Sequence, residues 1–122
     1  MTREEFVISV IKAVYEPAIR GTLAVIEKPP GNKPSEELVG LSEWVGGLSL
    51  DNKKKFEAAI ALTARQAVIG LLSVIDGVRQ IENTSNKGVL ELRFRKGDED
   101  VLLNSPEEEF LHDLFNQQVS LN

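Results

Sequence analysis

The spacing of apolar and polar residues changes along the chain, and this change predicts the elements. Apolar residues recur at helical spacing from Phe6 onward, after a Thr2 and Glu5 pair with the spacing of a capping box. Pro17 interrupts this pattern and predicts a kink or break, because proline lacks a backbone N–H. The helix is expected to continue to Glu27. Residues 28–34, with three prolines and a glycine, form a connector.

Two further helices are predicted in the middle of the chain. Ser35 is the expected N-cap of a short one. Asp51 is the candidate cap of the next, which is the longest and most apolar segment. Its residues 58–75 are apolar on nearly all sides, so we expect a central helix buried on more than one face. The Asp76-Gly77 pair is a turn signal that ends it.

After the turn at residues 76–77, the apolar residues recur at every second position instead of at helical spacing. Residues 89–95 alternate apolar and charged side chains, which predicts a half-buried strand. A connection over 96–100 and a partner strand over 101–103 complete an antiparallel hairpin. Arg93 and Arg95, on the polar face of the first strand, are expected to pair with acids across the hairpin. Residues 78–82 are a weaker candidate for a third strand.

A last helix is predicted to follow the hairpin, with Ser105 as N-cap, Pro106 at its first position and Glu108 completing a capping box. Residues 117–122 are expected to fray. The fold class is therefore α+β: four to five helices with a small C-terminal antiparallel β-hairpin followed by a final helix. A single compact domain over residues 1–122 is expected, in keeping with the usual size of domains.

Composition removes several classes of function. The chain has no cysteine, which excludes disulfides, thiolate metal sites and cysteine nucleophiles. Residues 2–5 carry two acids where a signal peptide has a basic region, so a cytoplasmic location is expected. Arg65 lies near the middle of the apolar 58–75 segment, where a charge costs roughly 2.5–3.5 kcal/mol in lipid. A soluble core helix and no membrane partner are predicted.

Acidity is concentrated near the C-terminal end of the sequence. Of 14 basic and 19 acidic residues, residues 97–122 hold seven acids and no Lys or Arg, leaving 14 basic and 12 acidic residues in 1–96. Such a local field attracts a basic protein partner. Hairpin-loop and first-turn positions also favour acids without any partner. The predicted partner-binding residues are Asp98, Glu99, Asp100, Glu107, Glu108, Glu109 and Asp113.

No catalytic or metal site is predicted. His112 is the one histidine, and as a general base it needs an orienting group and a pocket. Neighbouring Asp113 points about 100° away on a helix, whereas Glu108 and Glu109 are expected beside His112. The acids lack the spacing of an EF-hand loop, and no phosphate-binding loop or cofactor motif occurs. The acidic pI, about 4.9, disfavours nucleic acid.

The sequence thus favours a small cytosolic, non-catalytic binding protein. In size, acidity and lack of cysteine it resembles bacterial immunity and antitoxin proteins, which implies an acidic surface that neutralises a basic toxin or nuclease. One alternative is a structural or assembly module, such as a homodimer that uses spare apolar face on the central helix. A further alternative is a small enzyme that uses His112.

Overall fold

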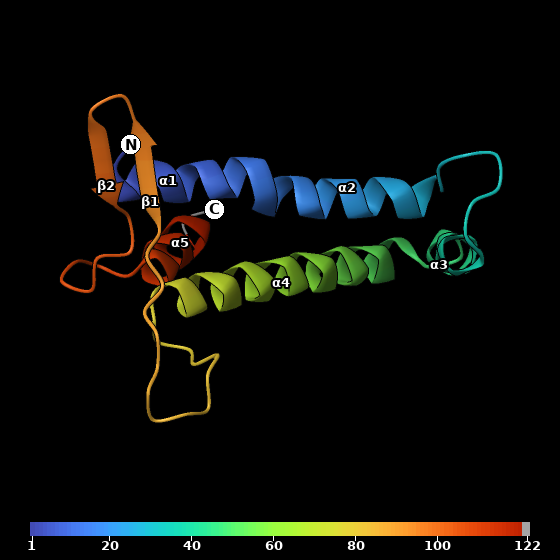
Figure 1. Ribbon diagram of the computed structural model, residues 1–122. Helices are drawn as coiled ribbons and strands as arrows, with labels where there is room; N and C mark the ends of the chain where they lie inside the picture. The colour runs from blue at the N-terminus through green and yellow to red at the C-terminus, as the bar shows by residue number, and fades with distance from the viewer. Residues whose placement is uncertain (121–122) are drawn as a thin grey trace. The chain divides into compact units, whose positions relative to one another are not determined.

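A computed structural model describes residues 1–120 and confirms the α+β class, with a two-stranded hairpin followed by a final helix (Figure 1). Its contacts divide the chain into two compact units: the terminal unit, Met1–Val14 with Gln66–Asn122, and the middle unit, Tyr15–Arg65. The expected single domain stays a prediction. The elements in order are α1 (Arg3–Val10), the π-helix η1 (Ile11–Tyr15), α2 (Glu16–Glu27), α3 (Glu36–Gly46), α4 (Leu50–Ile75), β1 (Arg93–Lys96), β2 (Glu99–Leu102) and α5 (Leu111–Ser120).

The first helical stretch contains both sequence-predicted features. The capping box forms, with Glu5 N–H donating to Thr2 Oγ1 at 3.1 Å and Thr2 N–H donating to Glu5 Oε2 at 3.3 Å. The interruption expected near Pro17 is the π-helix η1, after which α2 begins with proline in its first turn. Since proline has no N–H to donate to the preceding turn, a widened turn just before it is a usual accommodation.

The middle unit is built from α2, α3 and the first part of α4. Ser35 caps α3, its Oγ accepting from Leu38 N–H at 3.2 Å, as predicted. Ile26 is the buried apolar residue of the middle unit, 5% exposed. The Trp44 and Phe56 rings contact each other edge-on, with 5.7 Å between their centroids. Trp44 nevertheless stays 55% exposed. This unit therefore has little apolar surface that is fully removed from water.

Both ends of α4 are defined by local hydrogen bonds. Ser49, rather than the predicted Asp51, is the cap: its Oγ accepts from Asn52 N–H at 3.2 Å, and the helix begins one residue later. At the other end, Val78 N–H donates to Ser73 O and Gly77 N–H to Val74 O. Gly77 has a φ of 79°, so this is a Schellman ending in which glycine takes the left-handed position.

The hairpin pairs Arg93 with Leu102 and Lys96 with Glu99, and its turn is two residues with a φ of 58° at Gly97. This two-residue connection is shorter than the predicted one over residues 96–100. The strand also begins at Arg93 rather than at residue 89. Asn104 explains the late start: its side chain accepts from Leu92 N–H at 2.8 Å and donates to the oxygens of Leu90 and Ile75.

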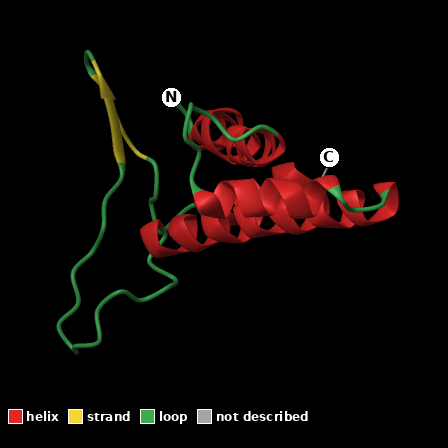
Figure 2. Cartoon of the chain, turned by 90° about the vertical axis from the view of Figure 1, so that its right-hand side faces the viewer, coloured by secondary structure: helices red, strands yellow, loops and turns green. Residues whose placement is uncertain are grey.

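Residues 78–82 do not form the predicted third strand. They belong to a loop from α4 to β1, drawn green in Figure 2, in which residues 77–91 are all exposed. Apolar side chains in this loop remain in water, with Ile81 66% and Val89 87% exposed.

The core of the terminal unit lies where α1 packs against α5. Val7, Leu111 and Phe115 are fully buried there, and Leu72 of α4 and Leu103 after β2 are 2% exposed. The burial of such side chains is the main stabilising term, at about 1.5–3 kcal/mol for each fully buried aliphatic or aromatic residue.

The start of α5 differs from the sequence prediction. The Ser105 and Glu108 capping box does not form; Glu108 N–H donates to the backbone oxygen of Ser105 in a turn, and the helix begins at Leu111. The α5 N-terminus is capped by Asp76 instead, a residue 35 positions earlier whose carboxylate accepts from Leu111 N–H. Residues 107–109 consequently precede the helix rather than forming its first turn.

The fraying expected from residue 117 is wrong as far as Ser120, where α5 ends. Val119 is half-buried one turn after the buried Phe115, so the apolar stripe of the helix continues past the point where the sequence was expected to fray. Residues 121–122 lie outside the described residues.

Candidate interaction surface

The predicted acidic residues all lie in the terminal unit, in two groups. The hairpin group comprises Asp98, Glu99 and Asp100. Asp98 lies in the turn, and Glu99 accepts from the amino group of Met1. Asp100 is placed by the strand register directly opposite Arg95. The hairpin therefore brings acids and arginines together on one ladder.

Asp100 is strongly engaged by basic side chains. Its Oδ1 lies 3.3 Å from Arg93 Nη1 and its Oδ2 lies 3.8 Å from Arg95 Nε. Arg93 also contacts Glu91 at 2.9 Å. Hydrogen bonds to Glu91 and then to Asp100 raise the pKa of Arg93 above its ordinary value. The expectation that Arg93 and Arg95 pair with acids across the hairpin is confirmed, and this pairing reduces the negative field of Asp100.

The second group comprises Glu107, Glu108, Glu109 and Asp113, around the start of α5. Glu108 Oε2 lies 3.5 Å from Nε of the buried Arg3, and Glu109 accepts from Gln117 Nε2. Asp113 Oδ1 lies 3.4 Å from His112 Nε2. This group follows directly from the end of β2, and it is tied to the terminal unit by these contacts.

Five of the seven acids have a partner in the described part of the chain, namely Glu99, Asp100, Glu108, Glu109 and Asp113. Intramolecular partners reduce the charge that an external basic protein meets. The acidic region is thus less free than the sequence suggests, although its residues 97–113 still hold seven acids and no Lys or Arg.

His112 has an orienting partner that the sequence did not reveal. Its Nδ1 lies 2.7 Å from Oδ2 of Asp76, and the same oxygen accepts from His112 N–H at 2.9 Å. The Asp76 side chain is 1% exposed, and the Phe110 ring stacks on His112 with a centroid distance of 5.4 Å. The expected neighbours Glu108 and Glu109 do not contact the imidazole, because they precede the helix. Asp76 thus both caps the start of α5 and orients the His112 ring.

No local signal indicates the contact between Asp76 and His112, since 36 residues separate them. An Asp followed by Gly at a helix end indicates the turn, and only the packing of the terminal unit brings its carboxylate to α5.

The most unusual surface lies along α4. This helix is long and apolar enough to cross a membrane by length and composition, yet only 22% of its apolar window is buried. The prediction of burial on more than one face holds only for the last turns of the helix, where Val68, Gly70, Leu72 and Ser73 are buried and point to different sides. Buried positions such as Val68 and Leu72 lie on one side, whereas Leu62 is 57% and Leu71 62% exposed. Before Val68 no residue of the helix is buried, and exposed positions gather on one side over residues 58–66.

We call the exposed side of residues 58–66 the α4 stripe. Its members are exposed, uncharged and related by steps of three and four along the helix: Ala58, Ala59, Leu62, Thr63 and Gln66. Leu71, nine residues after Leu62, points to the opposite side of the helix. Thr63 Oγ1 donates to Ala59 O at 2.8 Å, so its hydroxyl is satisfied inside the helix. The stripe is consequently a narrow surface free of charge over about two and a half turns.

The sequence indicates the apolar character of this segment, but the pattern predicts that the chain itself buries it. A helix that is apolar all round is usually covered on all sides. The feature that distinguishes the stripe is that its members are alanine, threonine and glutamine, with one leucine, whereas larger residues such as Val68 and Leu72 turn to the core.

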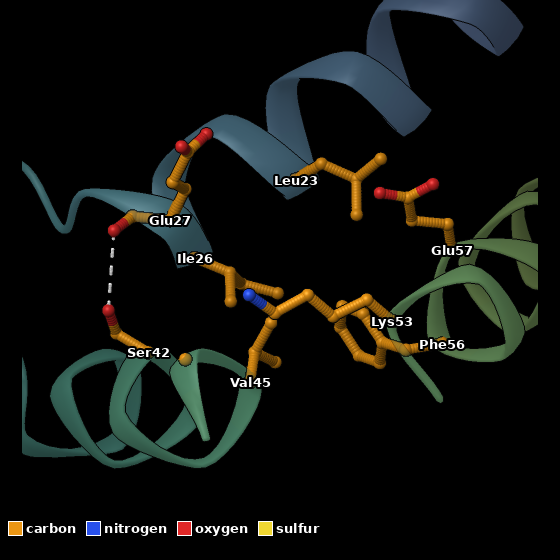
Figure 3. Close-up of a pocket in the computed structure, with 9 residues that line it drawn as sticks. Leu23, Ile26, Glu27, Ser42, Val45, Lys53, Phe56 and Glu57 are labelled. Atoms are coloured by element: carbon orange, nitrogen blue, oxygen red, sulfur yellow. Dashed lines mark hydrogen bonds between the residues drawn. The ribbon is translucent and has the colours of Figure 1, made fainter. Parts of the chain in front are cut away.

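The middle unit also contains a groove of about 240 Å³ among α2, α3 and α4. Figure 3 shows Ile26, Val45 and Phe56 turned toward one another, with Lys53 extended beside the Phe56 ring. Ser42 Oγ donates to Glu27 O at 3.4 Å at its edge. The lining combines apolar residues with four polar or charged ones, Glu27, Ser42, Lys53 and Glu57.

Comparison with protein-family models, with curated proteins and with solved structures finds no match to this chain. Within residues 1–120, no group of three or more His, Asp and Glu side chains is arranged to hold a metal ion.

Proposed function

We propose that this chain is a non-catalytic assembly module that associates with a second copy of itself through the α4 stripe. The observation that supports this most is the 22% burial of the apolar window of α4. Exposed apolar surface that is continuous over several turns is typical of an interaction site. Leu62, which is 57% exposed, supplies the largest apolar side chain of the stripe and loses water-exposed area on association.

A second copy is a better occupant than a bilayer. Arg65 and Gln66 lie near the middle of the apolar window, and a charge there costs roughly 2.5–3.5 kcal/mol in hydrocarbon. A second copy also offers complementary charge, because residues 97–122 hold seven acids and no Lys or Arg while 1–96 have 14 basic and 12 acidic residues.

Leu62 gives the scale of the effect. A fully buried leucine contributes about 1.5–3 kcal/mol, and Leu62 is more than half exposed in the single chain. Covering it in both copies therefore contributes roughly 2–3 kcal/mol before the cost of association. Replacement of one leucine by glutamate places two carboxylates in the contact, so we expect the association to be lost.

The test is light scattering on Leu62→Glu and on the control Val89→Glu. Both add one acid, and Val89 is 87% exposed in a loop away from the stripe. We expect a dimer for the wild type and the control, and a monomer for Leu62→Glu with unchanged circular dichroism. A monomeric wild type, equal dimerisation of both variants, or recovery of the wild type with phosphatidylcholine vesicles would each overturn the proposal.

The second candidate is the neutraliser of a basic protein, with the seven acids as its surface. The observation that favours it is that Asp98 and Glu107 are exposed and, in the described chain, form no contact of the kind that engages the other five. Reversing charge at Asp98, Glu99 and Asp100 should slow association with such a partner far more than it changes the melting temperature. An unchanged association rate would exclude the acidic hairpin as the contact.

A further inference from the structure

The groove of the middle unit contains a positive charge among apolar side chains. Its apolar lining consists of Leu23, Val45 and Phe56, which are half-buried, and the buried Ile26. Lys53 is half-buried as well, and its side chain extends past the Phe56 ring, so that the ammonium lies between Ile26 and Val45 (Figure 3). A cationic group in such surroundings is partly removed from water and is stabilised by a negative partner.

Lys53 does not use the acid that the helix places within its reach. Glu57 follows four residues later, which is the spacing of ion pairs on a helix surface. Lys55 makes such a pair on the same helix, with 3.4 Å between its Nζ and Oδ2 of Asp51. Within residues 1–120, the Lys53 ammonium forms neither an ion pair nor a hydrogen bond. Lys53 also lies in the first turn of α4, where the helix dipole favours negative charge beside it.

The two carboxylates of the lining lie away from this ammonium. The Glu27 carboxylate points out of the groove, and the Glu57 carboxylate lies beside Leu23, at the opposite end from the Lys53 nitrogen (Figure 3). A second negative group on a ligand would therefore meet Glu57. The groove fits a ligand with one negative group at the Lys53 end and an uncharged remainder.

The volume of the groove limits the size of this ligand. The groove measures about 240 Å³. At about 30 Å³ for each water, it has room for roughly eight water molecules. A six-carbon monocarboxylate, with roughly eight non-hydrogen atoms, is of the same size.

We infer that the groove is a binding site for a small monocarboxylate with an apolar tail. The carboxylate binds the Lys53 ammonium, and the tail lies along Ile26, Val45 and Phe56. An apolar lining with a single charged group that fixes the orientation of the ligand is typical of small-molecule sites. The site contains no residue of the α4 stripe, so this inference goes beyond the proposed function and does not rest on it.

The test is a titration with sodium hexanoate at constant ionic strength, followed by tryptophan fluorescence. Trp44 is the single tryptophan of the chain, and its ring contacts Phe56, so its emission reports on the groove. Lys53→Gln is compared with the control Lys54→Gln, which removes the same charge from an exposed neighbour that does not line the groove. We expect saturable binding to the wild type and the control, and binding at least ~10-fold weaker to Lys53→Gln.

A second comparison uses the wild-type chain alone and does not depend on the folding of a variant. Hexanol has the same tail without the negative charge, and it should bind at least ~10-fold more weakly than hexanoate. The absence of a saturable change with hexanoate at millimolar concentrations would overturn the inference. Equal weakening by Lys53→Gln and Lys54→Gln would do the same, and so would hexanol binding as tightly as hexanoate.

Discussion

Asp76 is expected to stabilise the terminal unit more than any other acidic residue outside the interaction surface. Its carboxylate is 1% exposed and accepts from Leu111 N–H at 3.0 Å, from His112 N–H at 2.9 Å and from the His112 ring at 2.7 Å. Asp76→Ala leaves these donors without their acceptor at the start of α5. Loss of an N-cap costs about 0.5–2 kcal/mol, and each lost hydrogen bond to a charged group about 1.5–3 kcal/mol.

Because the contributions overlap, we expect Asp76→Ala to lower the free energy of unfolding by about 3–4 kcal/mol. His112→Ala keeps both backbone bonds and should cost only about 1 kcal/mol. Asp98→Ala, in the exposed turn, is the matched control and should change stability by less than ~0.5 kcal/mol.

The assay is urea unfolding followed by circular dichroism at one fixed protein concentration, since self-association makes the midpoint depend on concentration. A free energy of unfolding for Asp76→Ala within about 0.5 kcal/mol of the Asp98→Ala control would refute the role assigned to this carboxylate.

Three other predictions concern elements whose contacts are clear. Ser49→Ala should cost about 1 kcal/mol in urea unfolding because it removes the cap of α4, whereas Asp51→Ala should be near neutral; the opposite order would restore Asp51 as the cap. Phe115→Ala, in the fully buried core, should cost about 3–5 kcal/mol, and a loss below ~1 kcal/mol would contradict its packing there. Gly77→Ala should lower the free energy of unfolding by about 1 kcal/mol, because residue 77 has a positive φ. Unchanged or higher stability of this variant would contradict the role of the glycine.

Local chemistry made much of the fold predictable. Thr2 with Glu5, Ser35, and the Asp76-Gly77 ending all act within a few residues of where they stand, and each behaves as its pattern indicates. The alternation over residues 89–95 likewise identified the hairpin, because period two follows from the geometry of a strand.

Errors arose where a distant group replaced a local one. Ser105 and Glu108 have the spacing of a capping box, but Asp76 supplies the acceptor for α5 from 35 residues away. Asn104 similarly occupies the backbone of Leu90 and Leu92, so the strand starts late. No window of local sequence contains such information.

Only part of the candidate surface could be predicted from the sequence. Hydropathy identified the apolar character of residues 58–75 but not that one side lacks cover, since an apolar helix looks the same whether the chain or a partner covers it. The acidic residues are evident from the distribution of charge along the sequence. Their contacts with Arg3, Arg93 and Gln117 are evident only in the folded structure.

The most direct test of the assembly proposal is sedimentation equilibrium of the wild-type chain over a wide concentration range at low and high salt. We expect a mass twice the 13.5 kDa of one chain, with weaker association at high salt because the second copy offers complementary charge. A mass of one chain up to high micromolar concentration at low salt would contradict the proposal.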